Sequence, residues 1–211
     1  LLNFYIGNTD WAHQNWYASK NREDIEGRWR FHCWDSEHIM KSMSFNNTNR
    51  YDDNAPTALH AKLIKNLKYK TLFGKKVSEH FFNNGLFIPE NVKQHYQELL
   101  DEIYNAVVGE SARWGDNQRE VPYTRDVEWE AQRSWLMNEY FEQRSEIVLQ
   151  QLKEHGWISA VEPPTIKIND SGYTNNPVKS TDNISLVSES GTVYYTLDGT
   201  DPYSQVFDSA N

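Results

Sequence analysis

Two short segments near the start of the chain decide its fold: Asn8-Thr9-Asp10-Trp11-Ala12-His13-Gln14-Asn15-Trp16 and Arg28-Trp29-Arg30-Phe31-His32-Cys33-Trp34-Asp35. The first has the composition of a polar and aromatic loop. The second alternates in polarity over residues 29–34, as a half-buried strand does. Residues 20–27 lie between the two segments and have the composition of a turn. We therefore expect a small β-hairpin after the loop, with Asp35 directly following its second strand.

Three polar side chains in these segments have the spacing of a catalytic site. Asp10 and Asn15 are separated as in the Asp-x-x-x-x-Asn loop of a kinase, where the Asp orients the attacking hydroxyl and accepts its proton. In that chemistry the Asn, together with a second Asp such as Asp35, holds the magnesium ions that bridge the phosphates. The same three residues also fit purely structural roles. Asp10 can cap a turn, Asn15 can be an ordinary loop amide, and Asp35 can end a strand. The spacing by itself therefore leaves phosphoryl transfer and a purely structural role open.

The sequence in and around these two segments resembles that of the CotH-type kinases, a family named for a spore-coat protein and found in bacteria and some eukaryotes. The resemblance covers roughly residues 1–160. It is carried by Gly7-Asn8-Thr9-Asp10-Trp11, Asn15-Trp16, Lys20-Asn21-Arg22, Gly27-Arg28-Trp29-Arg30-Phe31, Trp34-Asp35-Ser36-Glu37-His38, Ala55-Pro56-Thr57-Ala58-Leu59-His60, His80-Phe81-Phe82-Asn83-Asn84-Gly85 and Glu110-Ser111-Ala112-Arg113-Trp114-Gly115-Asp116.

The resemblance implies an atypical protein kinase that uses ATP and a divalent cation, Mg²⁺ or Mn²⁺, to phosphorylate Ser or Thr of surface or coat proteins. It implies that Asp10 is the catalytic residue and that Asn15 and Asp35 are the metal ligands. The residues that contact the nucleotide stay unassigned. Glu37 and His38 follow Asp35 directly. Two readings fit them equally well: residues that surround and hold the metal ligands, or a solvated turn.

A kinase also needs a first lobe that covers the phosphates and supplies a positive side chain. The ten glycines of this chain are scattered, and none forms Gly-x-Gly-x-x-Gly. The first residues lack the Met and the basic region of a signal peptide, so we expect an internal fragment. We expect the first lobe to precede Leu1, and residues 1–211 alone to be inactive as a kinase.

Composition narrows the possible partners. The 211 residues carry a formal net charge of −9, whereas nucleic-acid-binding surfaces are usually basic, so nucleic acid is not expected as a partner. No apolar run is long enough for a membrane span. The single cysteine, Cys33, excludes a disulfide framework, and its place in a strand-like run predicts a small buried side chain. The oligomeric state does not follow from the sequence.

Three helical segments are expected after the hairpin, at residues 56–82, from Pro89 onward and at residues 128–155. Gly74 or the residues before it are expected to break the first segment, and Asn83-Asn84-Gly85 to end it. A polar connection is expected at residues 109–126. The apolar face of the second helix is predicted to be Val92, Tyr96, Leu99, Ile103 and Val107, and that of the third to be Trp129, Leu136, Tyr140, Ile147 and Leu152.

The composition changes at Ser159, and Pro163-Pro164 has the composition of a linker. Residues 165–168, 184–187 and 192–197 form β-branched, alternating runs. The run Gly191-Thr192-Val193-Tyr194-Tyr195-Thr196-Leu197-Asp198-Gly199-Thr200-Asp201-Pro202 resembles the start of a chitobiase C-terminal-type β-sandwich module. Such modules accompany surface and secreted bacterial proteins, which implies an extracellular or cell-surface location.

The expected fold class is α+β. Residues 1–160 are predicted to be a mainly helical kinase C-lobe-like domain with a small β-hairpin. Residues 161–211 are predicted to be a partial all-β sandwich, because they are too few for a complete one. Two other functions stay open: a catalytically inactive surface scaffold or binding protein, and a small-molecule phosphotransferase. The presence of all three polar residues favours an enzyme over a scaffold.

Overall fold

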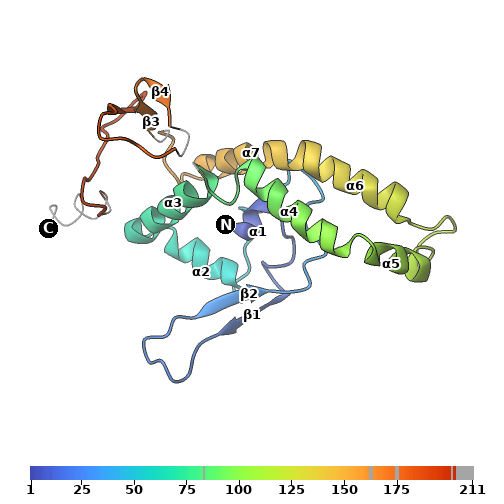
Figure 1. The fold of residues 1–211 in the computed structure, drawn as a ribbon. Helices are drawn as coiled ribbons and strands as arrows, with labels where there is room; N and C mark the ends of the chain where they lie inside the picture. Colours follow the sequence, from blue (N-terminus) through green and yellow to red (C-terminus); the bar gives the residue numbers. More distant parts are fainter. Residues whose placement is uncertain (83, 162–163, 174–175, 201, 203–211) are drawn as a thin grey trace. The chain divides into compact units, whose positions relative to one another are not determined.

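The computed structural model describes residues 1–82, 84–161, 164–173, 176–200 and 202. The chain divides into two compact units, Leu1–Ile158 and Ser159–Asn211. Helices dominate the first unit and short strands the second (Figure 1), so the α+β class is confirmed. Asn83, Pro163 and Asp201, which belong to three of the predicted features, lie outside the described residues.

The expected hairpin is present. A short helix, α1 (Leu2–Tyr5), leads into the polar loop, and strands β1 (Trp16–Ser19) and β2 (Arg30–Cys33) follow. The strands are antiparallel, with Trp16 opposite Cys33, and they project away from the helices (Figure 1). Cys33 is exposed, so its predicted burial is wrong. It lies on a two-stranded sheet, to which no third strand of the described residues is added.

The first predicted helical segment is two helices, α2 (Pro56–Leu63) and α3 (Leu67–Phe81). The break falls at residues 64–66 and not at Gly74, which lies inside α3. Asn66 explains the position of the break, because its side chain accepts a hydrogen bond of 3.2 Å from the backbone N–H of Tyr69 and so caps α3.

Helix α4 (Pro89–Ile103) begins at a proline, as expected. Its predicted apolar face is partly wrong, because Leu99 is 61% exposed whereas Leu100 is 5% exposed. Helix α5 (Ala106–Trp114) occupies the first part of the expected polar connection. That connection is therefore shorter than predicted.

One long helical stretch closes the first unit. It consists of the π-helical segment η1 (Arg125–Trp129), α6 (Glu130–Trp135), the π-helical segment η2 (Leu136–Tyr140) and α7 (Phe141–Glu154). The stretch matches the predicted third helix but begins slightly earlier. A π-helical turn has one extra residue, so it rotates the apolar stripe. Phe141, Val148 and Leu149 are buried in addition to predicted core residues such as Leu136 and Tyr140.

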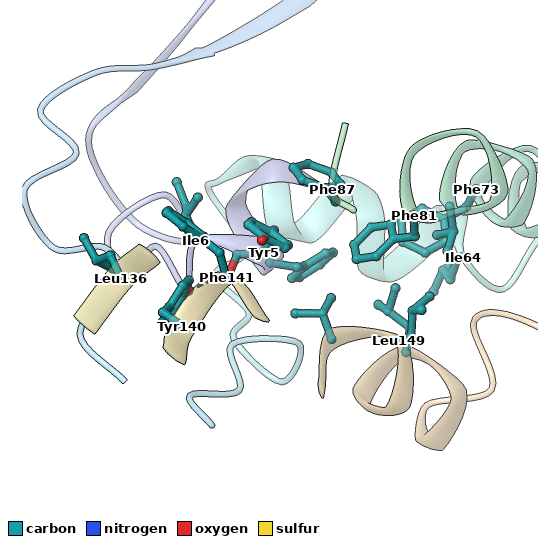
Figure 2. Close-up of a cluster of buried hydrophobic side chains, with 14 residues drawn as sticks. Tyr5, Ile6, Ile64, Phe73, Phe81, Phe87, Leu136, Tyr140, Phe141 and Leu149 are labelled. Atoms are coloured by element: carbon teal, nitrogen blue, oxygen red, sulfur yellow. Dashed lines mark hydrogen bonds between the residues drawn. The ribbon is translucent and has the colours of Figure 1, made fainter. Parts of the chain in front are cut away.

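The core of the first unit surrounds α1 (Figure 2). The ring of Tyr5 stacks on Phe87 with centroids 4.5 Å apart, and Phe81 packs against Phe87 at 4.9 Å. Tyr140 and Phe141 from the long helix complete this cluster. Burying one such side chain contributes about 1.5–3 kcal/mol, so α1 is held by packing and not by its own four residues.

A buried arginine ties the long helix to α1. Arg144 is 0% exposed, and its guanidinium donates to the carbonyls of Tyr5 at 2.7 Å, Phe4 at 2.7 Å, Met43 at 2.6 Å and Phe45 at 2.9 Å. The first two carbonyls lie at the C-terminal end of α1, where a cation is favourable. Arg144 therefore fixes the point at which the chain leaves α1 for the polar loop.

The second unit contains a three-stranded antiparallel sheet in the order β4-β3-β5. Strands β3 (Thr165–Ile168) and β5 (Ile184–Val187) were expected, and β4 (Ser171–Gly172) follows β3 through Asn169 and Asp170, both with positive φ. Residues 192–197 form no strand with any described residue, so that prediction is wrong. Their alternating pattern favours a strand, but a strand also needs a neighbour to pair with.

No helix among the described residues combines the length and the apolarity that crossing a bilayer requires.

Candidate active site

The polar loop is shaped by a buried asparagine. Asn8 is 1% exposed, and its Oδ1 accepts hydrogen bonds from the backbone N–H of Asp10 at 2.9 Å and of Trp11 at 3.3 Å. Asn47 holds the same residue from the other side, since its Nδ2 donates to the Asn8 carbonyl at 3.0 Å. Sequence reasoning missed both roles. An Asn two residues before the Asp is the available signal, because Asn side chains commonly accept from the N–H two positions on.

Asp10 lies at the centre of this loop and is 6% exposed. Its Oδ1 accepts from the Thr9 hydroxyl at 3.1 Å, and its Oδ2 accepts from the side-chain amide of Asn15 at 3.2 Å. Its backbone carbonyl accepts from the N–H groups of His13 and Gln14, both at 2.9 Å. The carboxylate is therefore held in one orientation by two neutral donors.

The hairpin register brings Asn15 and Asp35 together. Because Trp16 pairs with Cys33, the next residues outward are Asn15 and Trp34, and the Trp34 N–H donates to the Asn15 carbonyl at 3.1 Å. Asn15 Nδ2 also donates to the carbonyl of Asp35 at 3.1 Å. Asn15 and Asp35 have φ of 56° and 50°, a left-handed conformation that Asn and Asp tolerate better than most residues.

The Asp35 side chain is exposed and lies among other acids. A hydrogen bond shared with Glu37, and then the negative charge of Glu37, raise the pKa of the Asp35 carboxyl. The charge of Asp10 acts in the same direction, and His38 opposes it. This set of carboxyls therefore favours a positive charge between them.

Glu37 and His38 lie beside Asp10. One ligand atom from each of Asp10, Glu37 and His38 lies within 4.8 Å of the other two. The His38 carbonyl accepts from the backbone N–H of Thr9 at 3.3 Å, which fastens this segment to the Asp10 loop. His13, which sequence analysis placed between Asp10 and Asn15, is exposed and does not belong to this group.

A separate apolar hollow of about 690 Å³ lies between the hairpin and helices α2 and α3. Its walls include Phe31, His60 and Phe73, but not Asp10, Asn15 or Asp35. This hollow is therefore distinct from the acidic site.

A loop carboxylate, an amide at the loop exit and a second Asp after a hairpin are the polar groups of a kinase-like catalytic loop. The family model described as CotH kinase protein matches residues 1–148. The chain belongs to this family, and the membership supports a kinase-like function. The match does not extend to residues 159–211. No curated protein and no solved structure matches the chain.

Proposed function

We propose that the first unit is the second lobe of an atypical protein kinase, which transfers phosphoryl groups from ATP to Ser or Thr of surface or coat proteins. One observation supports this beyond family membership. The Asn15 side-chain amide donates both to the Asp10 carboxylate and to the Asp35 carbonyl, so a single group joins the three residues that this chemistry requires.

Asp10 is the catalytic residue in this proposal. The Thr9 hydroxyl and the Asn15 amide hold its carboxylate, and neither donor carries a charge that would neutralise it. The carboxylate thus stays available to orient a substrate hydroxyl and to accept its proton. Most of the rate would come from this positioning, as in other phosphoryl transfers.

Asn15 and Asp35 are the metal ligands in this proposal, and their chemistry fits Mg²⁺ or Mn²⁺. Both Asn15 Nδ2 contacts are donations, and among the described residues its Oδ1 accepts no hydrogen bond. That amide oxygen and the exposed Asp35 carboxylate are hard oxygen ligands. A divalent ion bound there neutralises the charge that develops on the phosphates.

The proposal extends to the rest of the protein. Residues 161–211 would begin a chitobiase C-terminal-like β-sandwich, and the protein would act outside the cell or on its surface. The antiparallel pairing of β3 with β4 and β5 supports the sandwich.

The direct test uses the full-length protein that contains residues 1–211. It is incubated with γ-labelled ATP, Mg²⁺ or Mn²⁺, and a Ser/Thr-rich protein acceptor, and the labelled residue is identified by phosphoamino-acid analysis. We expect label on Ser or Thr. A parallel reaction offers small hydroxylated molecules as acceptors, and label on these alone would indicate a small-molecule phosphotransferase. If neither metal supported labelling in either reaction, the result would favour the inactive scaffold.

A further inference from the structure

The phosphoryl-transfer scheme leaves two side chains of the acidic site unused. Glu37 and His38 each place a ligand atom within 4.8 Å of one another and of Asp10. Ligands of one metal ion at bond lengths of about 2.0–2.2 Å lie up to roughly 4.4 Å apart. The side chains of His38 and Glu37 are 45% and 54% exposed, so there is room for the small adjustment that closes the group around an ion. That adjustment takes His38 away from Lys41 and Glu37 away from Asp35.

The backbone holds the two segments of this group together before any ion binds. The His38 carbonyl accepts from the N–H of Thr9 at 3.3 Å, and the N–H of Met40 donates to the Ile6 carbonyl at 2.7 Å. These contacts pair His38 and Met40 with residues close to Asp10. The site is therefore assembled by the fold and not by a chance approach of surface side chains.

Asp10 supplies a second, independent reason to expect a cation. Its carboxylate is buried, yet no arginine or lysine of the described residues forms an ion pair with it. Its two side-chain partners, Thr9 and Asn15, are neutral. A buried carboxylate without a countercharge is costly, and a bound cation would remove that cost.

The imidazole of His38 determines which cations the group of Asp10, Glu37 and His38 would bind most tightly. Mg²⁺ is held by oxygen ligands, whereas imidazole nitrogen favours zinc and other transition metals. We infer that Asp10, Glu37 and His38 form a binding site for a divalent transition-metal ion, which binds Zn²⁺ and Co²⁺ in preference to Mg²⁺. This site has a different ligand set from Asn15 and Asp35.

Lys41 controls access to the imidazole. Its Nζ lies 2.6 Å from Nδ1 of His38, and because an ammonium only donates, Nδ1 must be the acceptor. A neutral ring then carries its proton on Nε2, which faces Glu37 Oε1 at 3.6 Å. Metal binding at Nε2 requires the proton to move to Nδ1, so Lys41 has to release the ring. Lys41 therefore competes with the metal.

One consequence rests on the proposed function. If Asp10 accepts the proton of the substrate hydroxyl, an ion on its carboxylate removes that capacity. Zn²⁺ would then inhibit phosphoryl transfer that is supported by Mg²⁺. The binding site itself does not depend on this consequence.

The test measures metal binding directly, by calorimetry on residues 1–211 without nucleotide. All titrations use a Cys33→Ser background, so that the exposed thiol does not contribute. We expect one Zn²⁺ per chain and at least about 100-fold weaker binding of Mg²⁺. His38→Gln and Glu37→Gln should each weaken Zn²⁺ binding by at least about 10-fold, and the visible absorption of bound Co²⁺ should change when the nitrogen ligand is lost.

A second Glu–His pair provides the matched control. His95 and Glu98 on α4 are exposed and lie 3.7 Å apart from Nδ1 to Oε2, but they have no third carboxylate among the described groups. His95→Gln and Glu98→Gln should leave Zn²⁺ binding unchanged. Lys41→Gln should strengthen it by roughly 10-fold, because it removes the competing donor and a positive charge.

Several results would overturn the inference. They are the absence of stoichiometric Zn²⁺ binding, equal affinity for Mg²⁺, and Zn²⁺ binding that survives both His38→Gln and Glu37→Gln. An unchanged affinity in Lys41→Gln would overturn the competition by Lys41. Failure of the proposed kinase function is distinguishable from failure of this inference. In that case the full-length protein would transfer no label from ATP, whatever the result of the Zn²⁺ titration.

Discussion

The side-chain amide of Asn15 donates a hydrogen bond of 3.2 Å to Oδ2 of Asp10. The same amide donates to the carbonyl of Asp35 at 3.1 Å. The carboxylate of Asp10 and the backbone carbonyl of Asp35 thus orient the Asn15 side chain. Its amide oxygen stays available to bind a ligand. A change at any of these three residues is therefore expected to affect the other two.

Asp10→Asn tests the catalytic assignment in the full-length protein. The substitution keeps the size of the side chain but removes the base, so phosphate transfer should fall by at least about 100-fold. The affinity for ATP should change much less. Steady-state kinetics with labelled ATP separates the two effects. Asp24→Asn in the exposed hairpin turn is the matched control, and an Asp10→Asn enzyme with normal turnover would assign the base to another residue.

Asp35→Ala tests the metal assignment. Loss of this carboxylate should abolish magnesium-dependent nucleotide binding by the full-length protein, because the ion that bridges the phosphates loses a charged ligand. Calorimetry at matched Mg²⁺ concentration measures this binding. Glu26→Ala, in the hairpin turn, serves as the control for loss of an exposed acid. Unchanged nucleotide affinity in Asp35→Ala would show that the metal is held elsewhere.

Arg144→Met tests the link between the long helix and the loop. The variant removes the buried guanidinium that donates to the carbonyls of Phe4, Tyr5, Met43 and Phe45, so the free energy of unfolding should fall by about 3–5 kcal/mol. Urea unfolding followed by tryptophan fluorescence suits this measurement, because all eight tryptophans lie in the first unit.

Gln143→Met, at the exposed neighbouring position, is the control for Arg144→Met and should change stability by less than about 0.5 kcal/mol. Hydrogen exchange should also become faster at Gly7 and Asn8 in Arg144→Met, because the end of α1 is released. If both variants were equally stable, the four carbonyl contacts would contribute nothing to the fold.

His60 predicts a pH dependence of stability. Burial lowers the pKa of His60 from 6.5 to about 4. Between these values the unfolded chain binds a proton that the folded chain does not, so stability falls as the pH falls from 6.5 towards 4. The ring is partly in contact with water, so we expect a loss of only about 1–2 kcal/mol.

The comparison with His60→Gln isolates this effect, since carboxyl groups also titrate in the same range. The free energy of unfolding is measured by urea titration at several pH values for both proteins. Their difference should change with pH between 6.5 and about 4. A difference that stays constant would mean that His60 takes up its proton equally in the folded and unfolded states.

The sequence was sufficient for features that depend on neighbouring residues. The alternation at residues 29–34 predicted the hairpin, and the hairpin register then explains why Asn15 and Asp35 meet. The three-to-four-residue spacing of apolar side chains predicted the main helices. Residue spacing also selected Asp10, Asn15 and Asp35 as the candidate site. The structure places Asp10, Asn15 and the Asp35 backbone in contact, and their catalytic and metal-binding roles stay predictions.

The tertiary structure decided whatever depends on a distant partner. Arg144 looks like a surface residue of a helix, but its partners are carbonyls about 100 or more positions earlier in the chain. Leu100 is buried in place of Leu99 because helix packing, and not periodicity alone, selects the face. Glu37 and His38 lie close to Asp10 because the Thr9 N–H donates to the His38 carbonyl and fastens their segment there. Sequence patterns report local geometry, whereas burial and countercharge are set by residues that folding brings from elsewhere in the chain.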